Sequence, residues 1–334
     1  MFDARFEFSL RQGKLVLPQS ENCGVFFPDR LGDIAPLAHL KPKIMHRFKP
    51  LVDLFHDQGF DPLPSETADL DIALVHVPRV KRLARHLIYT AVRATRPNGV
   101  IMVDGGKSQG IDSLLKDLKA RVELKGSVSK AHGKLAWFNA NGAFDDWQAD
   151  DFNSIKDGFV TKTGVFSADG IDPASRLLTA SLPGDLTGRF ADFGAGWGYL
   201  TRRLFDYPGI EHIDCIEADS AAIDCARQNC GDSRVAFHWS DATTWRALAP
   251  LDGIVMNPPF HHGRAADPAI GQAFIASAAR NLAAHGRLYM VANRQLPYEA
   301  VLQSCFADVK QMAQNNQFKV LFANRPLVHL RKTR

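Results

Sequence analysis

The sequence lacks the features that mark a membrane-spanning or secreted protein. No stretch of its 334 residues comes near the roughly 18 consecutive apolar side chains that a membrane-spanning helix needs. The first residues carry acidic side chains and have no apolar stretch of the kind found in signal peptides. We therefore expect no membrane partner and a cytoplasmic location.

Cysteine is scarce, and neither sign of charge dominates. The five cysteines contain no C-x-x-C pair and their number is odd, which argues against a disulfide framework and a zinc site, so no metal is expected. A net charge of +4 permits a nucleic-acid partner but does not require one. With 46% hydrophobic and 23% charged residues, the chain does not have the composition of a disordered, collagen-like or coiled-coil protein.

The second half alternates short apolar runs with helical patterns. This alternation predicts a mostly parallel, doubly wound α/β sheet. Ser220 is the expected N-cap of a helix. The expected strands are 189–193, 212–217, 235–239, 251–256 and 286–292, and the expected helices are 199–205, 220–229 and 273–284.

The first half repeats this pattern in a weaker form. Residues 71–78 resemble 252–259, and residues 98–103 parallel 285–291 at a nearly equal offset. A repeat of this kind predicts that the fold is duplicated within the chain.

The two copies differ where chemistry is expected. No D-x-G-x-G-x-G loop precedes residue 71, and His76-Val77-Pro78-Arg79 stands where the second half has Asn-Pro-Pro-Phe. We therefore predict two tandem Rossmann-like α/β domains, 1–145 and 158–334, of which the N-terminal one is degenerate.

A glycine-rich loop lies between the first strand and first helix of the second half. Gly194, Ala195 and Gly196 follow Asp192, and glycines there let a ligand approach the backbone at the carboxyl edge of the sheet. A dinucleotide site would require G-x-G-x-x-G, but Tyr199 occupies the third glycine position. The spacing suits S-adenosylmethionine, with the Asp192 carboxylate facing its amino group directly or through water.

Two further acidic residues follow the next strands. Glu217 ends the second strand, where a carboxylate can accept hydrogen bonds from both ribose hydroxyls. Asp241 follows the third strand and could accept from the adenine amino group, with a solvated loop acid as the alternative.

Asn257-Pro258-Pro259-Phe260 ends the fourth strand, at the sheet edge where active sites of this fold lie. The Asn257 side-chain oxygen and the Pro258 backbone oxygen can each accept one N–H of a planar exocyclic amine, which directs its lone pair at a sulfonium methyl group. The prolines fix the backbone, and Phe260 offers a face for stacking a flipped-out base. His261 could contact the base or phosphate, or be solvated.

These two motifs together resemble the ribosomal RNA small subunit methyltransferase C family of class I S-adenosylmethionine-dependent methyltransferases. Three further segments, 164–172, 291–298 and 318–320, are similar to the family's lead-in, its segment after the fifth strand and its final strand. The resemblance implies tandem methyltransferase domains, the first degenerate, that methylate N2 of a guanine in 16S rRNA.

The resemblance also implies roles for individual residues. Phe166 and Asp169 fall in the lead-in segment, which is expected to close over the cofactor or the base; Lys319 is a candidate contact to the RNA backbone, although a lysine extending from a strand end is an equal alternative. The sequence departs from the family at Trp197, which is bulkier than usual, and at Asp241, which has no clear match. Glu217 stands where the family usually has Asp.

Other functions remain open from the sequence alone. A large-subunit rRNA guanine-N2 methyltransferase shares the motif and the tandem halves, whereas DNA adenine-N6 and protein glutamine methyltransferases more often carry Tyr at the position of Phe260. A catalytically dead RNA-binding scaffold is disfavoured by the intact loop and Asn257, and an NAD-dependent oxidoreductase by Tyr199.

The first domain is expected to position RNA and to support folding. Lys81, Arg82 and Arg85 lie about one helical turn apart and could contact phosphates, or form a solvated helix face. The expected partner is rRNA or the small ribosomal subunit. Two covalently linked halves could replace a dimer, so a monomer is expected.

Overall fold

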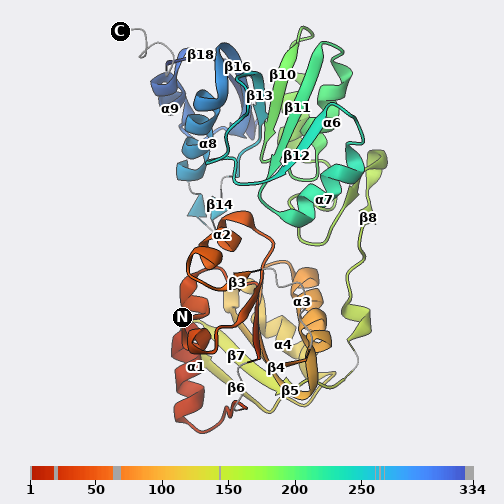
Figure 1. The fold of residues 1–334 in the computed structure, drawn as a ribbon, viewed down its shortest axis with the longest axis vertical. Helices are drawn as coiled ribbons and strands as arrows, with labels where there is room; N and C mark the ends of the chain where they lie inside the picture. Colours follow the sequence, from red (N-terminus) through yellow and green to blue (C-terminus); the bar gives the residue numbers. More distant parts are fainter. Residues whose placement is uncertain are drawn as a thin grey trace. The chain divides into compact units, whose positions relative to one another are not determined.

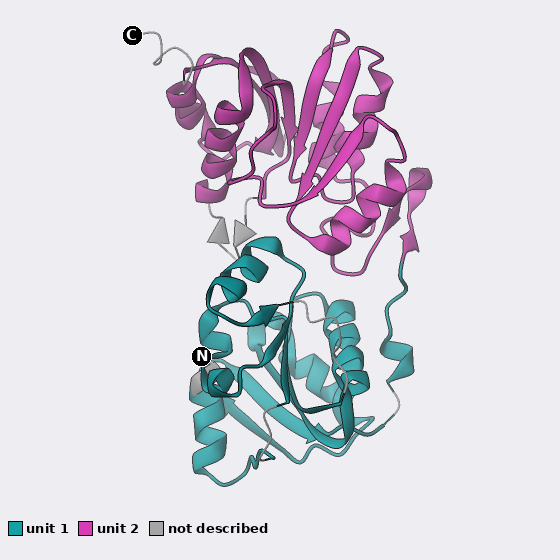
Figure 2. Cartoon of the chain, viewed as in Figure 1, with its two compact units in different colours: residues 1–151 teal, residues 152–334 magenta. Residues whose placement is uncertain are grey.

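The computed structural model describes residues 2–18, 22–62, 69–142, 144–259, 261–262, 265–266 and 268–327. The chain divides into two compact units, residues 1–151 and 152–334 (Figures 1 and 2). The first unit extends beyond the predicted end at 145 because Trp147 is only 4% exposed and packs into the core of that unit. The guanidinium groups of Arg85 and Arg121 lie over its ring.

The first unit is built on a seven-stranded sheet in the order β3-β2-β1-β4-β5-β7-β6. Strand β7 runs antiparallel to both of its neighbours, β5 and β6. Its strands are β1 (Cys23–Phe26), β2 (Lys43–Met45), β3 (Asp61–Pro62), β4 (Leu70–His76), β5 (Thr95–Gly106), β6 (Gly126–Lys130) and β7 (Gly133–Asn139). Its helices are α1 (Phe2–Arg11), α2 (Lys49–Asp57), α3 (Lys81–Ala94) and α4 (Ile111–Lys119), with short 3-10 helices at Leu31–Asp33, Ala35–Leu40, Lys107–Gln109 and Asp145–Trp147.

The second unit contains a seven-stranded sheet in the order β12-β11-β10-β13-β16-β18-β17. Its strands are β10 (Gly188–Phe193), β11 (Ile210–Glu217), β12 (Val235–Trp239), β13 (Leu251–Met256), β16 (Leu282–Asn293), β17 (Phe306–Gln314) and β18 (Phe318–Pro326). Its helices are α5 (Pro173–Ala180), α6 (Tyr199–Arg203), α7 (Ser220–Asn229), α8 (Pro268–Asn281) and α9 (Tyr298–Cys305), with short 3-10 helices at Lys156–Gly158 and Leu204–Asp206. Two short pairs, β8 (Asn153–Ser154) with β9 (Val160–Thr161) and β14 (His261–His262) with β15 (Ala265–Ala266), complete it.

Local sequence accounts for where two helices of the second unit begin. The carboxylate of Asp172 accepts from the backbone N–H of Ser175, and Pro173 occupies the first turn, so α5 begins there. The carboxylate of Asp219 caps α7 by accepting from Ala221. The cap is therefore one residue earlier than the predicted Ser220. The expected helix 273–284 begins and ends earlier than predicted. It is α8, which ends at Asn281, and β16 begins at the next residue.

The two sheets match strand for strand. Phe26 in β1 pairs with Val75 in β4, and Phe193 in β10 pairs with Met256 in β13. On the other side, Phe26 pairs with Met45 of β2, as Phe193 pairs with Ile216 of β11. The predicted duplication of an α/β domain is therefore confirmed, and the residues at the carboxyl ends of β1, β2 and β4 have register equivalents in β10, β11 and β13.

Within the described ranges, no helix is long and apolar enough to cross a membrane. The same ranges contain no cluster of three or more His, Cys, Asp or Glu side chains arranged to hold a metal ion. All five cysteines are free, and four of them are buried: Cys23, Cys215, Cys225 and Cys230.

Candidate active site

The glycine loop and the Asn-Pro-Pro motif leave the second sheet side by side. β10 and β13 are neighbouring parallel strands, and their last paired residues are Phe193 and Met256. Gly194 and Asn257 follow these two residues directly. From β10 the chain continues to β11 on one side, whereas β13 lies on the other, so the two motifs meet at the switch point of the sheet.

Asp192 is held by the helix that follows the loop. Its Oδ2 accepts hydrogen bonds of 2.8 Å from both the backbone N–H and the hydroxyl of Thr201 in α6. Its Oδ1 is buried and has no partner among the described residues. Burial raises the pKa of Asp192 to about 7, against the lowering effect of the Thr201 bonds. Sequence reasoning missed Thr201, because only the turn of the chain brings it back to Asp192.

Glu217 ties the loop to the end of β11. One of its carboxylate oxygens accepts from the backbone N–H of Gly196 at 2.8 Å, and the other accepts from Asp219 at 2.7 Å. Burial raises the pKa of Glu217 to about 7. A carboxylate oxygen has more than one lone pair, so both oxygens can still accept from a ligand hydroxyl. The predicted contact to ribose remains a prediction.

The loop leaves room on one side and is closely packed on the other. Gly198 has a φ of 90°, and a Cβ there would lie 2.8 Å from the sulfur of Cys230 and 3.2 Å from Ala226, so α7 can approach only a glycine. Gly196 also has a positive φ, but a Cβ there would meet nothing within 4 Å. The open side at Gly196, the unpaired Oδ1 of Asp192 and the carboxylate of Glu217 fit an amino-acid cofactor that carries a ribose.

Trp197 anchors the lead-in segment to the glycine loop. Its indole N–H donates to the backbone oxygen of Phe166 at 3.1 Å, and its ring packs against Phe159 at a centroid distance of 5.0 Å. The side chain of Phe166 itself is 62% exposed. Trp197, which is bulkier than the residue usual in the family, therefore has a structural partner in the lead-in segment. The predicted role of Phe166 over the cofactor remains a prediction.

Asn257 is held by the start of α5. Its amide nitrogen donates to the carboxylate of Asp172 at 2.9 Å and to the hydroxyl of Ser175 at 3.0 Å. Its Oδ1 accepts no hydrogen bond from any residue that the structure describes. The sequence argument missed both partners, although Asp172-Pro173 followed by Ser175 is a helix-start signal that could have located α5.

The remaining residues of the motif are placed only in part. Pro258 is buried and Pro259 is exposed. Phe260 lies outside the described residues. His261 belongs to β14, where its backbone pairs with Ala266. Its side chain is not among those that the structure describes. The stacking role of Phe260 and the base contact of His261 remain predictions.

Three other predicted site residues share no hydrogen bond with the residues described so far. Asp241 accepts from the backbone N–H and hydroxyl of Thr243, so its carboxylate already closes a turn. Asp169 is exposed. Lys319 is 6% exposed, and its ammonium group donates to Glu299 at 2.5 Å. This burial favours a structural role for Lys319 at the start of α9 over the predicted contact to the RNA backbone.

In the first unit, side chains fill the place that the cofactor loop occupies in the second. Phe27 follows β1 as Gly194 follows β10, and it adopts the same left-handed conformation, with a φ of 61°. Its ring stacks at 4.7 Å on His46, the register equivalent of Glu217, and Val25 replaces Asp192. Burial and the nearby Arg47 lower the pKa of His46 to about 4. These replacements explain why the first domain is degenerate.

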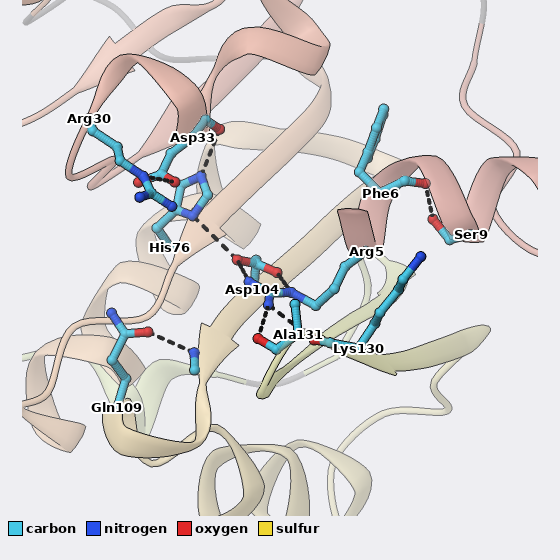
Figure 3. A network of polar contacts seen from close by, with 11 residues as sticks. Arg5, Phe6, Ser9, Arg30, Asp33, His76, Asp104, Gln109, Lys130 and Ala131 are labelled. Atoms are coloured by element: carbon cyan, nitrogen blue, oxygen red, sulfur yellow. Dashed lines mark hydrogen bonds and ion pairs between the residues drawn. The ribbon is translucent and has the colours of Figure 1, made fainter. Parts of the chain in front are cut away.

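The equivalent of the Asn257 position is also closed. His76 is the register equivalent of Asn257, and its imidazole lies 3.7 Å from Asp104, which forms two hydrogen bonds with Arg5 of α1 (Figure 3). The other ring nitrogen of His76 donates to the backbone oxygen of Asp33. A cavity of about 310 Å³ remains beside this network. The carboxylates of Asp104 and Asp33 that line it are already paired with Arg5 and Arg30.

The three basic side chains at the start of α3 that were candidate phosphate contacts are paired within the first unit. Lys81 and Arg85 both lie 2.7 Å from the carboxylate of Asp117, and Arg82 lies 2.7 Å from that of Asp150. These ion pairs favour the solvated helix face over the alternative of phosphate contacts.

Comparison with known proteins agrees with this geometry. A model of the methyltransferase small domain family matches residues 156–322. Ribosomal RNA small subunit methyltransferase C of Shewanella pealeana is 31% identical over 268 residues, which cover 77% of this chain and 78% of that protein. A relative of the same name from Shewanella oneidensis is 30% identical over 259 residues, or 75% of each chain.

A solved structure shares the whole architecture. The 16S rRNA N2 methyltransferase RsmC of T. thermophilus, in complex with AdoMet and guanosine, aligns with a TM-score of 0.77 and 24% identity over 93% of this chain and 90% of that one. At this level of identity the match shows a common fold, and the sequence relatives decide the family. The chain belongs to the ribosomal RNA small subunit methyltransferase C family.

Proposed function

We propose that this protein transfers the methyl group of S-adenosylmethionine to the exocyclic N2 amine of a guanine in small-subunit rRNA. The observation that carries the proposal is the amide of Asn257 at the carboxyl end of β13. Its oxygen is left to accept while both amide hydrogens are engaged by α5. The glycine loop lies on the neighbouring strand, where a methyl donor would be within reach of an amine bound at Asn257.

The cofactor supplies an electrophilic methyl group on a sulfonium. Asp192 would hold its amino group, and Glu217 would accept from its ribose hydroxyls at the end of β11. Gly196 leaves the space in which the ligand can approach the backbone. Phe166, held through its backbone by Trp197, would cover the bound molecule.

Asn257 and Pro258 act on the nucleophile. The exocyclic amine of guanine is a weak nucleophile because its lone pair is conjugated with the ring. Two acceptors, the side-chain oxygen of Asn257 and the backbone oxygen of Pro258, turn the lone pair out of conjugation and stabilise the positive charge that develops on nitrogen. After transfer, the nitrogen releases one proton to water. Phe260 would stack on the flipped-out base, and the rigid Pro258-Pro259 backbone would keep both acceptors in place.

The partner is small-subunit rRNA, free or assembled in the subunit. Methylation of rRNA places the protein in the cytoplasm. The chain carries two covalently linked copies of the domain, so we infer that the protein acts as a monomer.

The test is transfer of labelled methyl groups to 16S rRNA and small subunits from cells that lack this protein and, separately, to large-subunit rRNA, DNA and protein from the same cells. Nucleoside and amino-acid analysis then identifies the labelled product. We expect labelled N2-methylguanosine in 16S rRNA, and a loss of at least about a hundredfold in kcat for Asn257→Ala. Asp308→Ala, an exposed change on β17, is the matched control and should retain full activity. Label in large-subunit rRNA, in DNA adenine or in protein glutamine would overturn the substrate assignment.

A further inference from the structure

The amide of Asn257 is held in one orientation by two acceptors on the same helix. Its nitrogen carries two hydrogens, and both are used, one on the carboxylate of Asp172 and one on the hydroxyl of Ser175. Ser175 is buried, with 7% of its surface exposed. Since an ionised carboxylate can only accept, the atom that faces Asp172 must be the amide nitrogen.

We propose that Asp172 and Ser175 are positioning residues that fix the oxygen of Asn257 as the acceptor for the target amine. The inference rests on the proposed function of Asn257 and adds the two residues that make its amide productive. An amide rotated by 180° would place its oxygen against the Asp172 carboxylate, where two acceptors repel each other. The productive orientation is therefore selected before the substrate binds.

The carboxylate also strengthens the acceptor. A hydrogen bond from the amide nitrogen to a negative group polarises the amide and increases the negative charge on its oxygen. That oxygen then interacts more strongly with the positive charge that develops on the amine nitrogen during transfer. Asp172 therefore acts through Asn257 without touching the substrate.

Helix capping alone does not account for the arrangement. The same Oδ2 of Asp172 accepts from the backbone of Ser175, which caps α5, and from Asn257, which does not belong to that helix. Ser or Asn at position 172 would cap α5 about as well as Asp. This equivalence allows the two roles to be separated by substitution, because the short side chain of Ser keeps the cap but cannot reach Asn257.

The experiment compares Asp172→Ser, Asp172→Asn and Ser175→Ala in the full-length protein. Asn keeps an oxygen acceptor within reach of Asn257, and Ser181→Ala, at the carboxyl end of α5, is the matched control. We measure kcat, the KM for 16S rRNA, the Kd for S-adenosylmethionine by calorimetry, and thermal unfolding. We expect kcat to fall about tenfold for Asp172→Ser and for Ser175→Ala. KM, Kd and the unfolding temperature should stay close to wild type, and Asp172→Asn should recover part of the rate.

A double-mutant cycle with Asn257→Ala distinguishes positioning from structure. In the Asn257→Ala background, Asp172→Ser should cost no further activity, because the group that it positions is gone. The inference is overturned if Asp172→Ser keeps the wild-type kcat, or if its loss is added in full to that of Asn257→Ala. It is also overturned if, in all three variants, the Kd rises and the unfolding temperature falls together with kcat. Wild-type activity of Asn257→Ala itself would instead overturn the proposed function.

Discussion

His76 occupies in the first sheet the register position that Asn257 occupies in the second. In the first sheet, the last pair between β1 and β4 is Phe26 with Val75, and His76 comes next in the chain. In the second sheet, the last pair between β10 and β13 is Phe193 with Met256, and Asn257 comes next. One side chain opens a site with a free acceptor, whereas the other is bonded into its own domain. The two halves therefore share a backbone plan and differ in a few side chains at one edge.

This difference predicts a single cofactor site in each chain. Phe27 and His46 stack in the place of the glycine loop and the ribose carboxylate, so side chains of the first unit occupy the position that the ligand would take there. Titration with S-adenosylmethionine by calorimetry should give one molecule bound for each chain. The variant Asp192→Ala should lose that binding event completely. A second, weaker event that survives in Asp192→Ala would show that the first unit retains a site.

Cofactor affinity should depend on pH through Asp192 and Glu217. Burial raises the pKa of each carboxyl to about 7 in the cofactor-free protein. A raised pKa means that, between about pH 4 and 7, the folded protein holds protons that the unfolded chain has lost, so the contribution of these groups to stability falls as the pH rises through that window. The bound cofactor carries an ammonium group and favours the ionised carboxylates. Its Kd should therefore decrease from about pH 6 to pH 8.

The control for this pH dependence is Asp192→Asn, which keeps the shape of the side chain and cannot ionise. Its Kd should be higher than that of the wild type and should change less over the same range. Binding by the wild type near neutral pH should also release protons, measured by calorimetry in buffers of different ionisation enthalpy. An equal pH slope in wild type and Asp192→Asn would assign the dependence to another group.

The sequence predicted the parts of the site that are contiguous in the chain. Asp192 is the next-to-last residue of β10 and Asn257 directly follows β13. The ends of neighbouring parallel strands meet at one edge, so a motif together with a strand prediction locates both residues. Thr201, Asp172 and Ser175 were missed because their roles arise from the packing of helices against that edge, which no short motif records. The offset between 71–78 and 252–259 predicted the correspondence of His76 with Asn257, since register within a sheet follows spacing along the chain.

Trp197 should contribute to cofactor binding through its hydrogen bond to the backbone of Phe166. The variant Trp197→Phe keeps an aromatic ring against Phe159 and removes only the N–H donor. We expect the Kd for S-adenosylmethionine to rise about fivefold to tenfold, the equivalent of one hydrogen bond, while the free energy of unfolding falls by no more than about 1 kcal/mol. Trp147→Phe, in the core of the first unit, is the matched control and should leave the Kd unchanged. If Trp197→Phe binds the cofactor as tightly as the wild type, the lead-in segment is held by its other contacts.

The buried ion pair between Arg5 and Asp104 should dominate the stability of the first unit. Both side chains are about 5% exposed or less, and their two hydrogen bonds measure 2.6 and 2.7 Å. Removal of one partner leaves a buried charge without compensation, so Asp104→Ala should cost about 3–5 kcal/mol. The exposed pair of Arg325 with Asp308 is the control, and Asp308→Ala should leave the free energy of unfolding nearly unchanged.

The pH dependence of this pair has the opposite sign to that of the cofactor carboxyls. Burial would raise the pKa of Asp104, but the adjacent His76 and the Arg5 guanidinium outweigh it and hold the pKa below 3.8. The stabilisation is therefore complete above that pH and is lost as the pH falls through the lowered pKa. Urea unfolding from neutral to acidic pH should show the loss in wild type and not in Asp104→Ala. A double replacement, Arg5→Met with Asp104→Leu, should recover much of the stability, because an apolar pair removes the uncompensated charge. If the double variant is as unstable as Asp104→Ala, packing of α1 and not charge pairing holds this edge closed.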